Sequence, residues 1–253
     1  MLCSWLLDHS RIAQVSRVLA DIENDFRKAT HVTGEIKGSD IVRTFQSERN
    51  SPEYINKANK ALLHDLIRCL AENDAKIVAR AFAKRLHAKY ERENLYFFAH
   101  LTLFEQIYLL RNHLNARSGD LNPPNLPISI IADTLPSNKV FSSRQAITNA
   151  VKEIERQTQD TFPLLWSFDL SVENAFIRVA DILGRILFAI AHNRWSQEIG
   201  REKLYPQIDE LGYDLKALFF GVRTDAQLKS FQDRDEQNLF RVRWYPAPYH
   251  DLR

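Results

Sequence analysis

Two short apolar runs, each followed by a long amphipathic segment, most constrain the fold of this chain. Residues 128–134, ISIIADT, and residues 163–171, PLLWSFDLS, have the length and the β-branched or aromatic content of buried strands. Residues 142–158 and 172–193 follow these runs with apolar side chains at helical spacing. Strands that alternate with helices predict an α/β fold in which helices cover a sheet.

The rest of the chain adds further elements to this pattern. Residues 1–7, MLCSWLL, predict a short buried strand, and residues 10–29 predict a helix with Ser10 as its N-cap. Residues 75–90, AKIVARAFAKRLHAKY, fit either a strand or a helix. Residues 239–253 alternate apolar and basic side chains at their start, which predicts an edge strand or an arm.

The composition gives no sign of a zinc site or of a membrane span, and its charge leaves only local basic patches for nucleic-acid binding. Lys+Arg 34 against Asp+Glu 32 leaves a formal charge of +2, which is too balanced to indicate a nucleic-acid binder by itself. The two cysteines, Cys3 and Cys69, match no zinc spacing. Residues 174–193 form a long apolar stretch, but charged residues interrupt it, so it predicts a buried helix and no membrane span. We expect a cytoplasmic protein.

One turn uses two of the seven glycines in the chain. Residues 33–41, TGEIKGSDI, place Glu35 and Lys37 just before an expected short helix, which Ser39 or Asp40 can cap. The scarcity of glycine elsewhere indicates that this turn has a specific structural or chemical task.

Three acids stand at positions suited to metal binding. Glu35 precedes a helix, Asp133 ends a buried strand, and Asp181 lies within an apolar helix. Carboxylates that converge from separate elements at the rim of an α/β sheet can hold Mg²⁺ or Mn²⁺, which prefer oxygen ligands. Two such ions can activate a water molecule and stabilise the leaving oxygen of a phosphodiester.

Each acid also has a structural alternative. Asp181 can pair with Arg178 or Arg185 on its own helix face. Asp133 can start a turn, and Glu35 can pair with the lysine two residues later or face solvent. On the residue pattern alone, these structural roles outweigh a metal site.

Three motifs taken together favour the metal site. The stretches GEIKGSDI, ISIIADT and FDLSVENAFIRVADIL resemble, in this order, motifs of a bacterial family known as domain of unknown function 3800. That family is placed in the RNase H-like superfamily. The resemblance implies an RNase H-like mixed sheet flanked by helices over residues 1–195, with a C-terminal helical or arm extension over residues 196–253.

The resemblance also implies roles for individual residues. Glu35, Asp133 and Asp181 correspond to three of the four acids of an RNase H-like site for Mg²⁺ or Mn²⁺. Lys84 corresponds to the basic residue that follows the third strand of the family, where it would steady the scissile phosphate. The same correspondence makes residues 75–84 a strand.

The chain departs from the family at its first strand. That strand carries an Asp-Glu-Ser-Gly motif, which is missing here, and residues 1–10 resemble the second strand and its turn. Its loss removes the main metal ligand and leaves a sheet edge or gap to be covered. Three explanations of the missing strand remain open. The natural chain starts upstream, or another chain or the C-terminal arm fills the gap, or the protein is a degenerate relative. Asp8 and Asp169 are candidate substitutes for the missing acid, or ordinary turn residues.

These observations support two hypotheses of function. The first is a metal-dependent nuclease that hydrolyses phosphodiesters in RNA or DNA, and the alternative is a catalytically degenerate RNase H-like binding or assembly module. The basic residues between 76 and 92 can contact phosphates or form a solvated face. The aromatic and arginine side chains of residues 240–249 can stack on bases, or they can anchor a protein partner or a homo-oligomer.

Overall fold

The computed structural model separates the chain into two compact units. The first contains Met1–Ala79 and Ser171–Val242, and the second contains Arg80–Leu170 and Arg243–Arg253. The structure describes residues 2–46, 52–81, 128–133, 137–161, 164–198, 200–208 and 243–244, and single positions within 97–108 and 211–218. The predicted boundary between residues 195 and 196 stays a prediction.

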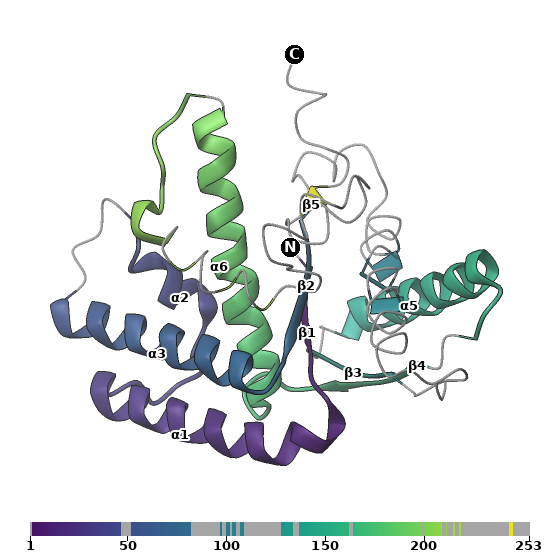
Figure 1. Ribbon diagram of the computed structural model, residues 1–253, viewed down its shortest axis with the longest axis horizontal. Helices are drawn as coiled ribbons and strands as arrows, with labels where there is room; N and C mark the ends of the chain where they lie inside the picture. Colours follow the sequence, from purple (N-terminus) through teal and green to yellow (C-terminus); the bar gives the residue numbers. More distant parts are fainter. Residues whose placement is uncertain are drawn as a thin grey trace, which may run out of the picture. The chain divides into compact units, whose positions relative to one another are not determined.

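Helices dominate the first unit. Those that the structure describes in full are α1 (Ile12–Thr30), α2 (Gly38–Arg43), α3 (Glu53–Glu72) and α6 (Ala175–Glu198), with short 3-10 turns at His9–Arg11 and Pro206–Ile208. Helices α1 and α3 lie side by side, and α6 contacts α1, α2 and the first strand (Figure 1). Helix α6 therefore joins α1, α2 and the first strand, while α3 packs chiefly against α1.

Two small sheets contain the described strands. Strands β1 (Leu2–Leu6), β2 (Lys76–Ala81) and β5 (Arg243–Trp244) form one sheet in the order β1-β2-β5. The parallel strands β3 (Ile128–Asp133) and β4 (Leu164–Asp169) form the other, and α5 (Ser137–Thr158) connects them in the chain. The predicted mixed α/β fold is confirmed at this level, whereas the RNase H-like topology stays a prediction.

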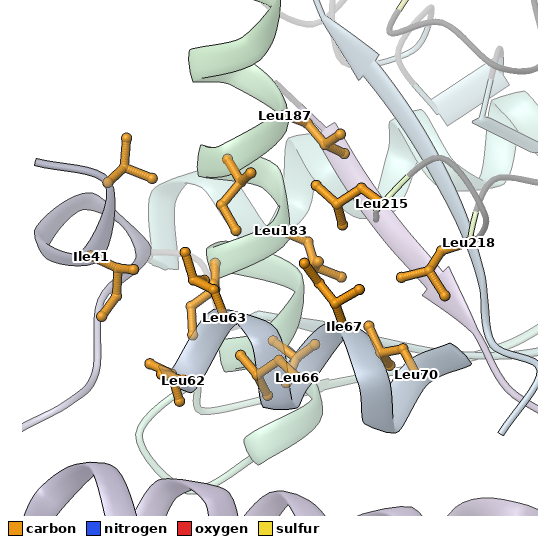
Figure 2. Packing of buried hydrophobic residues seen from close by; sticks show 14 of the residues in the cluster. Ile41, Leu62, Leu63, Leu66, Ile67, Leu70, Leu183, Leu187, Leu215 and Leu218 are labelled. Carbon is orange, nitrogen blue, oxygen red and sulfur yellow. The ribbon is translucent and has the colours of Figure 1, made fainter. Parts of the chain in front are cut away.

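The core of the first unit follows from helical periodicity. Leu62, Leu63, Leu66 and Leu70 recur at the spacing of one helix face in α3, and each is at most 3% exposed. Leucine and isoleucine side chains of α6 meet this face, as Figure 2 shows for Leu183 among others. Burial of such side chains stabilises the unit by about 1.5–3 kcal/mol each.

The element boundaries correct one predicted cap and extend one helix. Ser10 does not cap α1, because a 3-10 turn precedes the helix and Asp8 caps that turn by accepting a bond from Ser10 N at 2.8 Å. Helix α5 begins at Ser137, earlier than predicted. Residues 76–81 form a strand, so the ambiguous segment is extended over this part.

Strand β5 confirms the predicted edge strand for Arg243–Trp244, which pair in parallel with Arg80–Ala81. The remainder of residues 239–253 lies outside the described residues. Within the part of the chain that the structure describes, no helix combines the length and the hydropathy needed to cross a membrane. The predicted cytoplasmic location stays a prediction.

Candidate functional site

A hydrogen bond joins the glycine-containing turn to α6, against which α2 packs. The backbone N–H of Gly38, the first residue of α2, donates to Asp181 Oδ2 at 2.8 Å. Lys37 is the N-cap residue of α2, but its side chain makes no capping bond. Asp181 therefore caps α2 from another helix: it accepts from the N–H of the first helical residue, one of the four N–H groups that have no partner within a helix. The prediction that Ser39 or Asp40 caps this helix is wrong, because both lie inside it.

Gly38 is required at this contact by the lack of space. A Cβ atom on Gly38 would lie 2.8 Å from the carbonyl oxygen of Asp181 and 2.8 Å from the Cα of Ile182. Backbone atoms cannot move aside as a flexible side chain can, so any larger residue would push α2 away from α6. The other glycine of the turn, Gly34, has nothing within 4 Å of such a Cβ.

Glu35 is held beside this contact by the preceding loop. Arg27, near the end of α1, donates to the carbonyl oxygens of Val32 and Gly34 at 3.2 and 2.6 Å. Ile36 is 3% exposed and anchors the segment in the core. On either side of this anchor Glu35 is partly exposed and Lys37 is exposed, so both side chains reach out of the core.

Each of the two acids near Gly38 lies next to an exposed basic side chain. Asp181 Oδ1 is 3.7 Å from Arg185 Nε, and these side chains are 46% and 56% exposed. Glu35 Oε2 is 3.9 Å from Lys37 Nζ, with exposures of 27% and 59%. The structural alternatives named from the sequence, pairing with Arg185 and with Lys37, are thus both present.

The other candidate partner of Asp181 has a different task. Arg178 Nε and Nη2 each donate to a carboxylate oxygen of Glu23 at 2.7 Å. Its Nη1 also donates to the carbonyl oxygens of Ser171 and Val172 at 2.8 and 2.9 Å. The Arg178 and Glu23 side chains are 9% and 14% exposed, so this pair joins α1 to the start of α6.

Strand β1 also reaches the Asp181 contact. A Cβ atom on Gly184 would lie 3.2 Å from Cys3 Cβ, which places β1 against α6. Burial raises the pKa of the half-buried Cys3 thiol to about 12; the N-terminal ammonium opposes this change and the Asp181 carboxylate adds to it. The Cys3 thiol is therefore protonated at neutral pH.

Asp133 belongs to the second unit. It is exposed at the end of β3, and its partner in the parallel register is Asp169 at the end of β4. Asp169 Oδ1 accepts a bond from Leu170 N at 2.9 Å, as a turn residue does.

Asp8 accepts two bonds from Ser10, which lower the pKa of its carboxyl group. Lys84 lies outside the described residues, as do most of the basic residues around it.

The donor chemistry near Gly38 suits a hard cation, but the set is small. Glu35 and Asp181 supply carboxylate oxygens, which Mg²⁺ and Mn²⁺ prefer. Among the residues that the structure describes, no three His, Cys, Asp or Glu side chains gather closely enough to hold a metal ion. Sequence analysis missed Glu23 and the capping role of Asp181, because both contacts join segments far apart in the chain.

Comparisons with family models, with curated proteins and with solved structures found no match for this chain. The resemblance to the domain of unknown function 3800 family therefore stays a prediction that rests on the three sequence motifs.

Proposed function

We propose that this protein is a metal-dependent phosphodiester hydrolase that acts on RNA or DNA, with Glu35 and Asp181 as ligands of Mg²⁺ or Mn²⁺. The contact between Gly38 N and Asp181 Oδ2 carries the proposal. Glu35 precedes Gly38 by three residues, so its Cα lies within about 11 Å of Gly38. Two of the acids predicted from separate motifs thus come from elements in direct contact.

The geometry of Asp181 suits a metal ligand. Metal-ligating carboxylates are commonly held by a hydrogen bond to their second oxygen, and Gly38 N–H gives such a bond to Oδ2. This bond orients Oδ1 while leaving it bound only loosely by Arg185. A bound divalent ion would supply an activated water molecule and a counter-charge for the leaving oxygen.

Two further predicted roles belong to this proposal without structural support. Asp133 stays a predicted additional ligand, and Lys84 stays the predicted basic residue beside the scissile phosphate. Both roles come from the resemblance to the family.

Hydrolysis of labelled RNA and DNA oligonucleotides in Mg²⁺ or Mn²⁺ tests the proposal. We expect Glu35→Gln and Asp181→Asn to lose at least about a hundredfold in rate, because each removes a ligand charge. Asn at position 181 keeps an oxygen for Gly38 N–H, so far-UV circular dichroism should show an intact fold. Asp25→Asn, which removes an exposed carboxylate paired with Lys28, is the matched control. Full activity of Asp181→Asn would refute the proposal.

One observation favours the alternative, a catalytically degenerate binding or assembly module. Both oxygens of Asp181 already make contacts, one with Gly38 N and one with Arg185, and the capping role alone explains an acid at this position. The two functions differ in one respect that is simple to measure. The module predicts that the wild-type chain shows no metal-dependent turnover of RNA or DNA, whereas the hydrolase predicts turnover.

A further inference from the structure

Two exposed basic side chains flank the contact between α2 and α6. Lys37 directly precedes Gly38 in the chain. A Cβ atom on Gly38 would lie 2.9 Å from Arg185 Cγ, so the aliphatic part of Arg185 passes over the start of α2. Both side chains thus start close to Gly38, and each charged group lies beside one of the two candidate metal ligands.

Neither basic group is held firmly. Arg185 reaches Asp181 only through Nε at 3.7 Å, and Lys37 reaches Glu35 at 3.9 Å. More than half of each basic side chain is exposed. Ion pairs of this kind contribute about 0–1 kcal/mol, so little free energy opposes their exchange for another anion.

Arg178, on the same helix, is by contrast held by several hydrogen bonds. Its guanidinium group makes two bonds to Glu23 and two to backbone carbonyl oxygens, and the side chain is 9% exposed. No such network holds Arg185 among the described contacts. The loose pairing of Arg185 thus follows from its exposed position near Gly38, because Arg178 on the same helix is firmly bound.

We propose that Lys37 and Arg185 bind a phosphate group of RNA or DNA beside the Glu35–Asp181 site. The inference rests on the proposed function. If Glu35 and Asp181 held a divalent ion, Lys37 and Arg185 would lose their present partners and could pair with a phosphate. Arginine can donate two parallel bonds to phosphate oxygens, and lysine acts as a mobile point charge. The two residues would position the substrate backbone against the carboxylates.

Fluorescence anisotropy with a short labelled single-stranded RNA, in Ca²⁺ in place of Mg²⁺, tests this inference. We expect Lys37→Gln and Arg185→Gln each to weaken binding by about tenfold at low salt. Each should also reduce the slope of log affinity against log salt concentration by about one, because one phosphate contact is lost. The matched controls are Lys28→Gln and Arg68→Gln, which remove the same charges from the exposed pairs Lys28–Asp25 and Arg68–Asp65. They should change neither quantity.

Arg185→Lys separates charge from folding defects. It keeps the positive charge, so we expect it to restore the salt slope while recovering only part of the affinity, since the paired donors are lost. Unchanged RNA affinity and salt slope in Lys37→Gln and Arg185→Gln would overturn the inference. Calorimetric binding of Mn²⁺ by the wild-type chain would then still uphold the proposed function. Absence of Mn²⁺ binding by the wild-type chain would overturn both.

Discussion

Two arginines on α6, Arg178 and Arg185, have opposite roles. Arg178 is buried and makes four hydrogen bonds that join α1, the start of α6 and the preceding turn. Arg185 is mostly exposed and makes one loose contact with Asp181. The comparison shows that arginines on one helix can differ widely in burial and in the number of hydrogen bonds that hold them.

The same comparison applies to the acids beside them. Glu23 is 14% exposed and fully engaged by Arg178, whereas Asp181 is 46% exposed and keeps one oxygen only loosely paired. The Arg178–Glu23 pair is enclosed, whereas the Arg185–Asp181 pair near Gly38 faces solvent. The predictions below test whether this division holds.

The largest expected effect comes from breaking the buried pair. Arg178→Met leaves the Glu23 carboxylate without its partner, which should lower the free energy of unfolding by about 3–5 kcal/mol. The equivalent change Arg185→Met should cost less than about 1 kcal/mol, because exposed pairs contribute little. Urea unfolding followed by far-UV circular dichroism measures both.

A double variant checks the cause of this loss. Glu23→Leu combined with Arg178→Met removes both charges and should recover part of the stability, since no unpaired buried charge remains. Equal losses in Arg178→Met and Arg185→Met would contradict the division between the two arginines.

The second effect concerns the space at Gly38. Gly38→Ala should destabilise the first unit by about 1–3 kcal/mol, because the added methyl group meets the backbone of Asp181 and Ile182 at 2.8 Å. Gly34→Ala adds the same methyl group where nothing lies within 4 Å and should change stability by less than about 1 kcal/mol. Thermal unfolding of the two variants side by side gives the comparison; similar midpoints would show that α2 does not approach α6 this closely.

The third effect separates the capping role of Asp181 from its charge. Asp181→Ala should lower stability by about 0.5–2 kcal/mol, because Gly38 N–H loses its acceptor. Asp181→Asn keeps an acceptor and should retain most of that stability. Chemical unfolding of both variants provides the test, and an equally large loss in Asp181→Asn would indicate that the charge, and not the hydrogen bond, stabilises α2.

The smallest effect is a pH dependence from Cys3. Burial raises the pKa of its thiol to about 12, above the ordinary thiol pKa of about 8.5. The folded state therefore favours the protonated thiol, and its contribution to stability is present below pH ~8.5 and is lost as pH rises toward 12. Cys3→Ala should show a shallower alkaline loss of stability than the wild type, measured by unfolding midpoints across this range. Identical slopes would place the thiol in water.

The sequence predicts the elements better than the contacts between them. Strands β3 and β4 and helix α6 were predictable because their apolar residues follow the periods of strands and helices. The spacing within α6 predicted that Asp181 could pair with either Arg178 or Arg185. Arg178 pairs with Glu23 on α1 instead, which leaves Arg185 beside Asp181. A partner on another helix leaves no local signal in the sequence.

The candidate site was predictable only in part, because its main contact also joins segments that are far apart in the chain. The scarcity of glycine singled out the turn at residues 33–41. It did not predict that Gly38 contacts Asp181, which lies 143 residues away in the chain. The predicted caps Ser39 and Asp40 were wrong because α2 begins at Gly38, so both residues lie inside the helix. The roles of Asp133 and Lys84 stay predictions from the resemblance.

Calorimetric titration with Mn²⁺ tests most directly whether the exposed acids near Gly38 form a metal site. The wild-type chain should bind Mn²⁺, Glu35→Gln and Asp181→Asn should each lose that binding, and Asp25→Asn should keep it. The Asp181→Asn variant retains the bond from Gly38, so a loss would reflect the missing charge and not a displaced helix. Absence of binding in the wild type, or equal binding in wild type and Asp181→Asn, would contradict the account and leave Asp181 as the cap of α2.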